Sequence, residues 1–341
     1  MTPKRLLTFL LGIDVLCGGV TRIAAAAPLS DAEGSLRRRV VVLFGGDVVL
    51  AEHYERTVGD SIAIAFAALD TLRSVDIAMV NLESPVTTRG TRVTKPFNFR
   101  TNPRFLPALT GGGIDIVNLA NNHIFDYGDV GLFDTIVYLD SCGVLHVGAG
   151  RDGAEARAPV IVRCAGVTVA FLGYYGGGES PAATAATPGV AHRDGTTIVD
   201  DIHTIRQRAD YVVINLHWGT ERAPLPDRDQ VAFAHALIDG GADAVVGHHP
   251  HVLQGVELYR GKPIAYSLGN FIFGGNSRDS YDTALLELTL EEAHVGVRVL
   301  PVRVDTWQAR MLGGAPGDAV IALVRDRSRM FRRSIFTSEQ E

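Results

Sequence analysis

The chain has 341 residues, of which 46% are hydrophobic and 21% are charged, and its formal net charge is -6 at pH 7. Enough apolar residues are present for a large core, which excludes an intrinsically disordered chain. The acidic balance argues against nucleic acid as a partner, because phosphate backbones select concentrated Lys and Arg.

The N-terminus has the pattern of an export signal. Lys4 and Arg5 precede the apolar stretch 6–20, and the small residues 24–27 before Pro28 offer a cleavage site. We therefore expect residues 1–28 to be a signal peptide and the protein to be extracytoplasmic, in the cell envelope. Because charged Asp14 and Arg22 weaken this pattern, an uncleaved N-terminal membrane anchor and a misassigned start codon remain the alternatives.

Five apolar runs along the chain predict buried strands that each end in polar side chains. The runs are 39–44, 77–80, 114–120, 211–216 and 243–247, and the side chains that follow them are Asp47, Glu83, Asn122 with His123, His217, and His249 with His251. Open α/β sheets bind ligands beyond the carboxyl ends of their strands. We expect the five sets of side chains to meet at one edge.

The remaining elements predict a layered α/β fold. Apolar spacing indicates helices over 61–74, 129–142, 227–240 and 318–331, with Asp129 and Asp227 in the cap regions of the second and third. Strand pairs are predicted over 160–164 with 167–174, 252–258 with 263–267, and 283–290 with 296–304. Two mixed sheets flanked by helices accommodate this number of strands. The loop 175–194 is long enough to be a lid or substrate wall, or a merely mobile connection.

A metal ion explains the polar strand ends together. Each of these residues, considered alone, also has an ordinary structural explanation. Asp47 could cap a helix, Glu83 could be a solvated carboxylate, Asn122 a turn residue and His217 a core histidine. Carboxylate, amide and imidazole donors without thiolate suit Mn²⁺, Zn²⁺ or Fe. More than four candidate ligands, one of them a carboxylate able to bridge, indicate two divalent ions about 3.5–4 Å apart, an arrangement that favours hydrolysis of phosphoesters or amides.

The His249-Pro250-His251 segment is the densest of these donor groups. On extended backbone, residues two apart point to one side, and Pro250 restrains the chain between them. We therefore expect both imidazoles to face the metal, with a His-rich surface loop as the alternative.

Two further sequence features carry less information. The basic residues between Arg89 and Arg104 either attract an anionic substrate or belong to a solvated loop. Cys142 and Cys164 lie outside every motif, so we expect apolar packing rather than a disulfide framework or thiolate site.

Six motifs, in the same order along the chain, resemble those of the CapA (PgsA) family of poly-γ-glutamate capsule biosynthesis. The resemblance covers roughly residues 40–305, and we expect residues 306–341 to form a C-terminal helix and a polar tail. The six motifs are Gly46-Asp47-Val48-Val49-Leu50, Asn81-Leu82-Glu83-Ser84-Pro85, Leu119-Ala120-Asn121-Asn122-His123 with Asp126-Tyr127-Gly128, His217-Trp218-Gly219-Thr220-Glu221, Gly247-His248-His249-Pro250-His251-Val252-Leu253-Gln254 and Tyr266-Ser267-Leu268-Gly269-Asn270-Phe271. The resemblance implies a calcineurin-like metallophosphatase fold, a four-layer αββα sandwich.

The resemblance also implies residue roles. Asp47, Glu83 and His251 would hold a first metal, and Asn122, His217 and His249 would hold a second that shares Glu83. His123 would be the general acid, oriented by Asp126, with a role in supporting the ligands as its alternative. The remaining family positions, Asn121, Glu221 and Asn270, would support the ligands or face the substrate. His248 would face away.

The chain departs from the metallophosphatase pattern at two ligand positions. The pattern has Asp-x-His after the first strand, whereas Val49 stands in the third position, and Glu83 replaces the bridging Asp. The loss of an imidazole should weaken the first metal and favour a mononuclear centre. His53 is a nearby substitute, with a solvated side chain as the other interpretation.

These features predict an exported metal-dependent hydrolase that acts on a phosphoester or on an anionic envelope polymer, with or beside a membrane synthase or ligase complex. The alternatives are a non-catalytic metal-containing accessory protein that binds the polymer or its synthase, and a binding module whose strand-end residues hold no metal.

Overall fold

Two sheets form the centre of the molecule, and the computed structural model describes residues 22–25 and 38–337. The first, here the β2 sheet, has the order β17 (Gln308–Met311), β16 (His294–Asp305), β15 (Tyr281–Glu291), β2 (Arg39–Val49), β3 (Ile77–Leu82), β4 (Ile116–Asn118) and β5 (Leu145–Val147), and β14 (Asn270–Phe273) pairs with β2. From β2 to β5 the neighbouring strands are parallel, whereas β15, β16 and β17 are antiparallel additions.

The second sheet, here the β10 sheet, has the order β1 (Arg22–Ala25), β7 (Val160–Cys164), β8 (Val167–Tyr175), β10 (Tyr211–His217), β11 (Ala244–His248), β13 (Lys262–Ala265) and β12 (Val256–Tyr259). Its strands β8, β10, β11 and β13 run parallel. A short antiparallel pair is made by β6 (Ala149–Gly150) and β9 (Gly189–Val190). Both sheets are therefore mixed: the β2 sheet is antiparallel on the side of β15, β16 and β17, and the β10 sheet has antiparallel pairs at β7-β8 and β13-β12.

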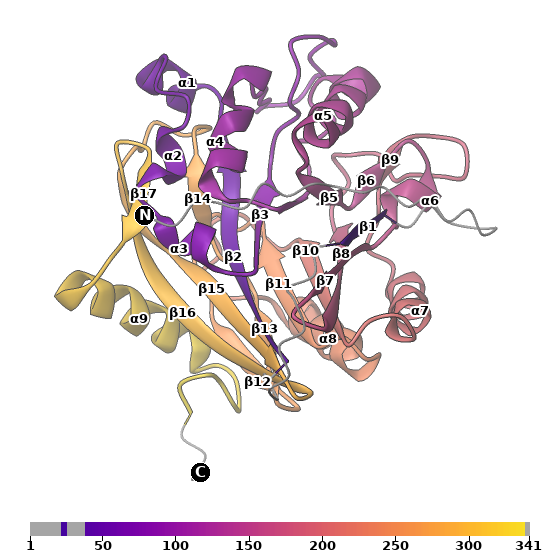
Figure 1. The fold of residues 1–341 in the computed structure, drawn as a ribbon, viewed down its shortest axis with the longest axis vertical. Helices are drawn as coiled ribbons and strands as arrows, with labels where there is room; N and C mark the ends of the chain where they lie inside the picture. Colours follow the sequence, from indigo (N-terminus) through magenta and orange to yellow (C-terminus); the bar gives the residue numbers. More distant parts are fainter. Residues whose placement is uncertain (1–21, 26–37, 338–341) are drawn as a thin grey trace.

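Helices surround the two sheets. They are α1 (His53–Val58), α2 (Ile64–Ala67), α3 (Asp70–Ser74), η1 (Pro103–Phe105), α4 (Leu106–Gly112), α5 (Gly128–Cys142), α6 (Gly153–Ala156), α7 (Gly195–Arg206), α8 (Arg228–Asp239) and α9 (Gly314–Ser328). Figure 1 shows α4 and α5 beyond the β2 sheet, with α7 and α8 beyond the β10 sheet.

Alternation along the strands produces three separate apolar layers. Phe44 on β2, Phe171 on β8 and Val246 on β11 belong to the core between the sheets. Their neighbours along the strands point outward, where Leu43 packs with the α4 and α5 side chains and Val245 packs with those of α7 and α8. Because side chains alternate between faces, both sheets bury apolar residues on both faces, and the four-layer αββα sandwich expected from the sequence is confirmed.

One predicted helix is divided in the structure, and another helix was not predicted. The helix expected over 61–74 is two short helices, α2 and α3, because the chain leaves helical geometry at Ala68 and Leu69. The Arg73 guanidinium donates to the carbonyl oxygens of Phe66 and Ala67, both at 3.1 Å, and satisfies the end of α2. Helix α7 was not predicted at all.

The predicted cap residues behave differently from each other. Asp227 caps α8 and forms a capping box with Gln230. Asp129 does not cap α5, which begins one residue earlier and has Tyr127 in the cap position; Asp129 lies in the first turn, where its charge favours the helix dipole. The C-terminal helix runs over 314–328 rather than 318–331.

The leader lies outside the described residues except for β1, whose backbone pairs with β7. In the part of the chain that the structure describes, no helix combines the length and apolarity needed to span a bilayer. Cys142 and Cys164 are half-buried, are free and pack against apolar clusters, in agreement with the sequence interpretation.

Candidate metal centre

The carboxyl ends of both sheets deliver the polar side chains to one place. Asp47 lies two residues before the end of β2 and is paired in register with Asn81 on β3 and Asn270 on β14. On the β10 sheet, His217 and His248 are register partners at the ends of β10 and β11. Cross-strand partners point to the same face of a sheet. Both imidazoles therefore face the layer between the sheets, where Asp47 and Glu83 are buried.

Asp47 is fully buried and surrounded by donors. Asn81 Nδ2 donates to its Oδ1 at 2.9 Å, and His251 Nδ1 lies 3.0 Å from its Oδ2. Burial opposes ionisation, but the hydrogen bond and charge of His251 outweigh it and hold the pKa of the Asp47 carboxyl below its ordinary value. Asp47 is thus an anion in a buried site.

Glu83 is a second buried carboxylate in the same site, and its situation is the opposite. Burial first, and then the negative charge of Asp47, raise the pKa of Glu83 well above its ordinary value. Its Oε1 lies 3.4 Å from His217 Nε2 and 3.8 Å from His251 Nε2, yet forms no hydrogen bond to any described residue. A buried acceptor of this kind lacks a cationic partner.

Burial favours the neutral form of three imidazoles around these carboxylates, His217, His248 and His249. Burial lowers the pKa of His217 well below its ordinary range and lowers the pKa values of His248 and His249 to about 4. The Nδ1 atoms of His248 and His249 are buried without a hydrogen-bond partner among the described residues. Neutral imidazole nitrogen is the form that binds metal.

Strained backbone presents the two imidazoles of the His249-Pro250-His251 segment. β11 ends at His248, and His249 and His251 have φ values of 97° and 57°. The extended geometry expected from the sequence is therefore wrong: left-handed backbone, rather than strand alternation, brings both side chains to the centre. Such conformations are costly for non-glycine residues and concentrate at functional sites.

The residues fit a metal centre in which Glu83 is shared. Ligand atoms of Asp47, Glu83 and His217 lie within 4.8 Å of one another, and so do those of Glu83, His249 and His251. The division that the resemblance implies is also compatible with the contacts, because His251 Nδ1 lies 3.0 Å from Asp47 Oδ2 and the ring centroids of His217 and His249 are 4.7 Å apart. Asn122 lies next to the first group, because its Oδ1 is 2.8 Å from His217 Nε2.

The missing imidazole at position 49 is not replaced by His53. Val49 is buried in an apolar cluster with Ala51, Phe99 and Phe273. His53, half-buried at the start of α1, belongs to neither ligand group. His248 does not face away as expected: it is 1% exposed, and its Nδ1 lies 3.6 Å from Asp47 Oδ1.

Beside the ligand groups, His123 and Asp126 form the pair expected of an acid and its orienting carboxylate. His123 Nδ1 lies 2.8 Å from Asp126 Oδ2, which also accepts a hydrogen bond from the Phe99 backbone N–H. Burial lowers the pKa of His123, although Asp126 opposes this shift. With Nδ1 directed at Asp126, Nε2 is the nitrogen left for proton transfer.

Lys95 connects this pair to the loop that carries Asn122, and no motif in the sequence singles it out. Its ammonium lies 2.6 Å from Asp126 Oδ1 and donates at 2.6 Å to the Asn122 carbonyl oxygen. It also lies 3.5 Å from Glu179 of the 175–194 loop. Within the basic segment from Arg89 to Arg104, Lys95 is therefore anchored at the centre, whereas Arg89 pairs with Asp134 and residues 88–97 other than Lys95 are exposed.

An amide network supports the carboxylates. Asn81 donates to both Asp47 and Glu83, and its own Oδ1 accepts from Asn118 Nδ2 at 3.0 Å. Asn121 donates to the Leu82 carbonyl oxygen and accepts from the backbone N–H of His123. Asn121 thus shapes the loop that carries Asn122 and His123. The role of Asn81 was missed, although its position on β3, two residues before Glu83, is a visible signal.

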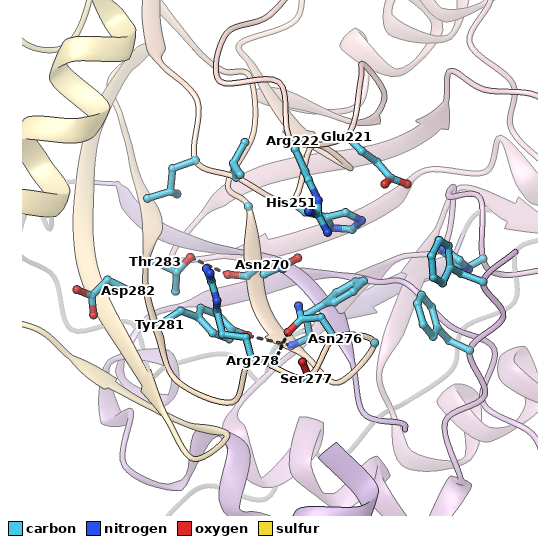
Figure 2. A pocket seen from close by; sticks show the side chains of 18 of the residues that line it. Glu221, Arg222, His251, Asn270, Asn276, Ser277, Arg278, Tyr281, Asp282 and Thr283 are labelled. Atoms are coloured by element: carbon cyan, nitrogen blue, oxygen red, sulfur yellow. Dashed lines mark hydrogen bonds between the residues drawn. The ribbon is translucent and has the colours of Figure 1, made fainter. Parts of the chain in front are cut away.

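A cavity of about 560 Å³ opens beside the centre. His123, His251, Glu221 and Asn270 line it, and Figure 2 shows His251, Glu221 and Asn270 around this space. Of the remaining expected site residues, Asp47, Glu83 and His217 lie deeper and are fully buried. The cavity gives a substrate access to the imidazole side of the centre.

Comparison with known proteins decides the family. The family described as "Bacterial capsule synthesis protein PGA_cap" matches residues 41–275. The chain belongs to this capsule synthesis family. The PGA biosynthesis protein CapA of Bacillus subtilis (strain 168) is 34% identical over 262 residues, which cover 74% of this chain and 68% of that protein.

A second relative covers more of the chain. The probable polyglutamine synthesis accessory protein of Mycobacterium tuberculosis (strain CDC 1551 / Oshkosh) is 33% identical over 330 residues, 87% of this chain and 85% of that protein. Among solved structures, a putative 5'-nucleotidase from Staphylococcus aureus in complex with alpha-ketoglutarate superposes with a TM-score of 0.50 at 13% identity, over 84% of this chain and 58% of that chain. This likeness confirms the metallophosphatase-like fold.

Proposed function

We propose that this CapA-type protein is an exported, metal-dependent hydrolase that acts on a phosphoester or amide bond during synthesis or export of an anionic envelope polymer. The observation that carries the proposal is Glu83, whose buried Oε1 has no hydrogen-bond partner among the described residues and lies between two potential ligand groups. Carboxylates shared in this way are typical of centres with two divalent ions.

Asp47, Glu83, Asn122, His217, His249 and His251 would hold one or two divalent transition-metal ions, with Mn, Zn and Fe as the candidates. Bound divalent ions lower the pKa of water and offset negative charge that develops at a scissile group. His123 would protonate the leaving group through Nε2, while Asp126 holds the ring by its Nδ1. Lys95 contacts both Asp126 and the backbone carbonyl oxygen of Asn122, and these contacts hold His123 in position relative to the candidate ligands.

A hydrolysis assay on the purified mature chain tests the proposal. The protein would be loaded separately with Mn²⁺, Zn²⁺ or Fe²⁺, and turnover of bis(p-nitrophenyl) phosphate and shortening of poly-γ-glutamate would be measured. Asn122→Ala and His249→Ala are expected to reduce turnover at least about 100-fold, whereas His294→Ala, which removes an exposed imidazole on β16, is expected to leave it unchanged.

The same assay separates the alternative function. The relative in M. tuberculosis is named as an accessory protein, which favours a non-catalytic role in a synthase complex as the second candidate. Full metal occupancy by elemental analysis without turnover of either substrate would support that role. Protein that contains no metal after purification without chelator would contradict both candidates.

Export rests on the leader sequence, and we propose it as part of the same function. Expression of the full chain in a bacterial host, followed by fractionation and N-terminal sequencing, tests it. Mature protein that begins near Pro28 outside the cytoplasm is expected; cytoplasmic protein with Met1 intact would contradict export.

A further inference from the structure

Two arginines extend the cavity beyond the metal centre. Arg222 follows the His217 motif, and Arg278 belongs to the loop between β14 and β15; both line the cavity that His123 and His251 also line. Figure 2 shows Arg222 beside His251 on one side and Arg278 beside Tyr281 on the facing side. The two guanidinium groups therefore come from opposite walls of one space.

The backbone fixes Arg222 at the rim of the centre. Arg222 has a φ of 60°, and its backbone N–H donates at 2.7 Å to the carbonyl oxygen of Pro250, between His249 and His251. A left-handed conformation is unfavourable for arginine and persists only where the surroundings impose it. The position of Arg222 is thus coupled to the segment that carries two candidate ligands.

The opposite wall is fixed by hydrogen bonds. The Arg278 backbone N–H donates to Asn276 Oδ1 at 2.8 Å. The Tyr281 hydroxyl donates to the Phe271 carbonyl oxygen at 3.0 Å and accepts from the Phe273 N–H at 3.1 Å. These bonds tie the loop that carries Arg278 to β14, beside Asp47.

Neither guanidinium is neutralised within residues 38–337. No carboxylate of these residues lies within 4.0 Å of the Arg222 or Arg278 side-chain nitrogens. Asp282, the carboxylate nearest to Arg278 in sequence, is held by Arg303 with bonds of 2.7 and 2.9 Å. A third cavity arginine, Arg327, donates to the Leu253 carbonyl oxygen. Within residues 38–337, Arg222 and Arg278 therefore line the cavity with guanidinium groups that no carboxylate pairs with.

We infer that Arg222 and Arg278 form an anion-binding subsite that takes a carboxylate or phosphate group of the substrate next to the bond that the metal centre attacks. The planar guanidinium binds such oxyanions through paired hydrogen bonds. Glu221 adds a negative charge on the same wall, which disfavours an anion placed nearer His251 than the two arginines. The inference rests on the proposed location of the reaction, but anion binding does not require turnover.

Equilibrium binding tests the subsite separately from catalysis. Calorimetric titration of the Mn²⁺-loaded protein with glutarate, and in a second arm with inorganic phosphate, would compare the parent protein with Arg222→Gln, Arg278→Gln and the double variant. Each single substitution is expected to weaken binding about tenfold, the typical effect of losing a charged hydrogen bond. The anion whose binding is weakened more by the substitutions, glutarate or phosphate, identifies the group that the subsite prefers.

Matched controls keep the result interpretable. Arg332→Gln removes an exposed arginine outside the cavity lining and is expected to bind both anions as the parent does. Arg222→Lys and Arg278→Lys should retain only part of the affinity, because lysine keeps the charge but loses the paired geometry. Equal affinity of the double Gln variant and the Arg332→Gln control would overturn the subsite, as would absence of binding to the parent. Loss of anion binding in a protein without turnover would support the subsite and contradict only the hydrolase.

Discussion

At the residue scale, Glu83 determines how the centre responds to protons and cations. Its carboxyl is buried beside the ionised Asp47, which raises its pKa well above the ordinary value. A proton therefore occupies Glu83 in the metal-free protein at pH values where a solvated glutamate is ionised. A divalent ion that binds there must displace this proton, so cation binding and pH are linked.

Cation affinity is consequently expected to fall as the pH is lowered. While one proton is displaced, each unit decrease in pH should weaken binding about tenfold. Competition titrations with a fluorescent chelator between pH 6 and 8, and the buffer dependence of the binding enthalpy, would measure the effect. A pH-independent affinity with no proton release would show that Glu83 is already ionised in the metal-free protein.

Replacement of Glu83 by Gln should raise the stability of the metal-free protein and remove the stability that added metal provides. Since the folded pKa exceeds the unfolded one, the metal-free fold loses stability as pH rises above the unfolded value. Glu83→Gln removes this cost and is expected to stabilise the metal-free protein at neutral pH by at least about 1 kcal/mol. The same variant should lose the stabilisation by added metal. Urea denaturation at pH 5 and pH 8 tests the sign, because the variant's advantage should shrink at the lower pH.

Asn81 is the second residue whose change should be informative. Its amide donates to both Asp47 and Glu83, so Asn81→Ala removes the bonds that orient two candidate ligands. Cation affinity is expected to fall about 10- to 100-fold. Asn102→Ala provides a control, because Asn102 caps η1 away from the ligand groups; it should alter stability and leave cation affinity intact. Equal affinities for the two variants would assign Asn81 a purely structural role.

At the scale of elements, close backbone contacts hold the strand ends that carry the donors. A Cβ on Gly247 of β11 would lie 1.9 Å from the Tyr266 carbonyl oxygen, which also accepts from Trp218 Nε1 at 3.1 Å. The space is closed by backbone rather than by a flexible side chain. Glycine at this position allows β11 and the segment after β13 to approach, just before the His248–His251 donors.

Gly247→Ala is accordingly expected to destabilise the fold by about 3 kcal/mol, the upper part of the usual range for overpacking. Gly111→Ala is the matched control: Gly111 lies in α4 with no atom within 4 Å of an added Cβ, so alanine should stabilise by about 0.5–1 kcal/mol. Urea denaturation midpoints would compare the two. A Gly247→Ala protein as stable as the parent would show that β11 shifts freely.

At the scale of the whole molecule, the centre joins the two sheets. Asp47 and Glu83 come from the β2 sheet, whereas His217, His249 and His251 come from β10 and the segment after β11. Apolar packing between the sheets ends near this edge, where the buried carboxylates and imidazoles begin. A bound cation would therefore crosslink the two central layers.

Removal of the metal should lower the melting temperature and speed hydrogen exchange at this edge of the sheets. At a free cation concentration 100 times its dissociation constant, binding contributes about 2.7 kcal/mol, which corresponds to a melting temperature about 4 °C above that of chelated protein for a chain of this size. Calorimetry with and without EDTA would detect the change, and hydrogen exchange should show faster exchange at the ends of β3 and β11. Identical melting temperatures for the two forms would contradict a cation at this interface.

Local patterns in the sequence determined the strands, the polar residue at each strand end and the layered fold class, because alternation and helical spacing are short-range consequences of burial. The same patterns placed a helix over 61–74 that the packing of Phe66 and Leu69 divides into two. They also missed α7.

Only the tertiary structure decided how the donors combine. Asp47 and His251 are 204 positions apart and lie 3.0 Å from each other, a contact that no local periodicity encodes. The left-handed backbone at His249 and His251, the inward direction of His248, and the positions of Lys95 and the facing arginines depend on two sheets meeting at one edge. The sequence specified which chemical groups are present at the strand ends; packing between the sheets specified their distances, and those distances determine the candidate chemistry.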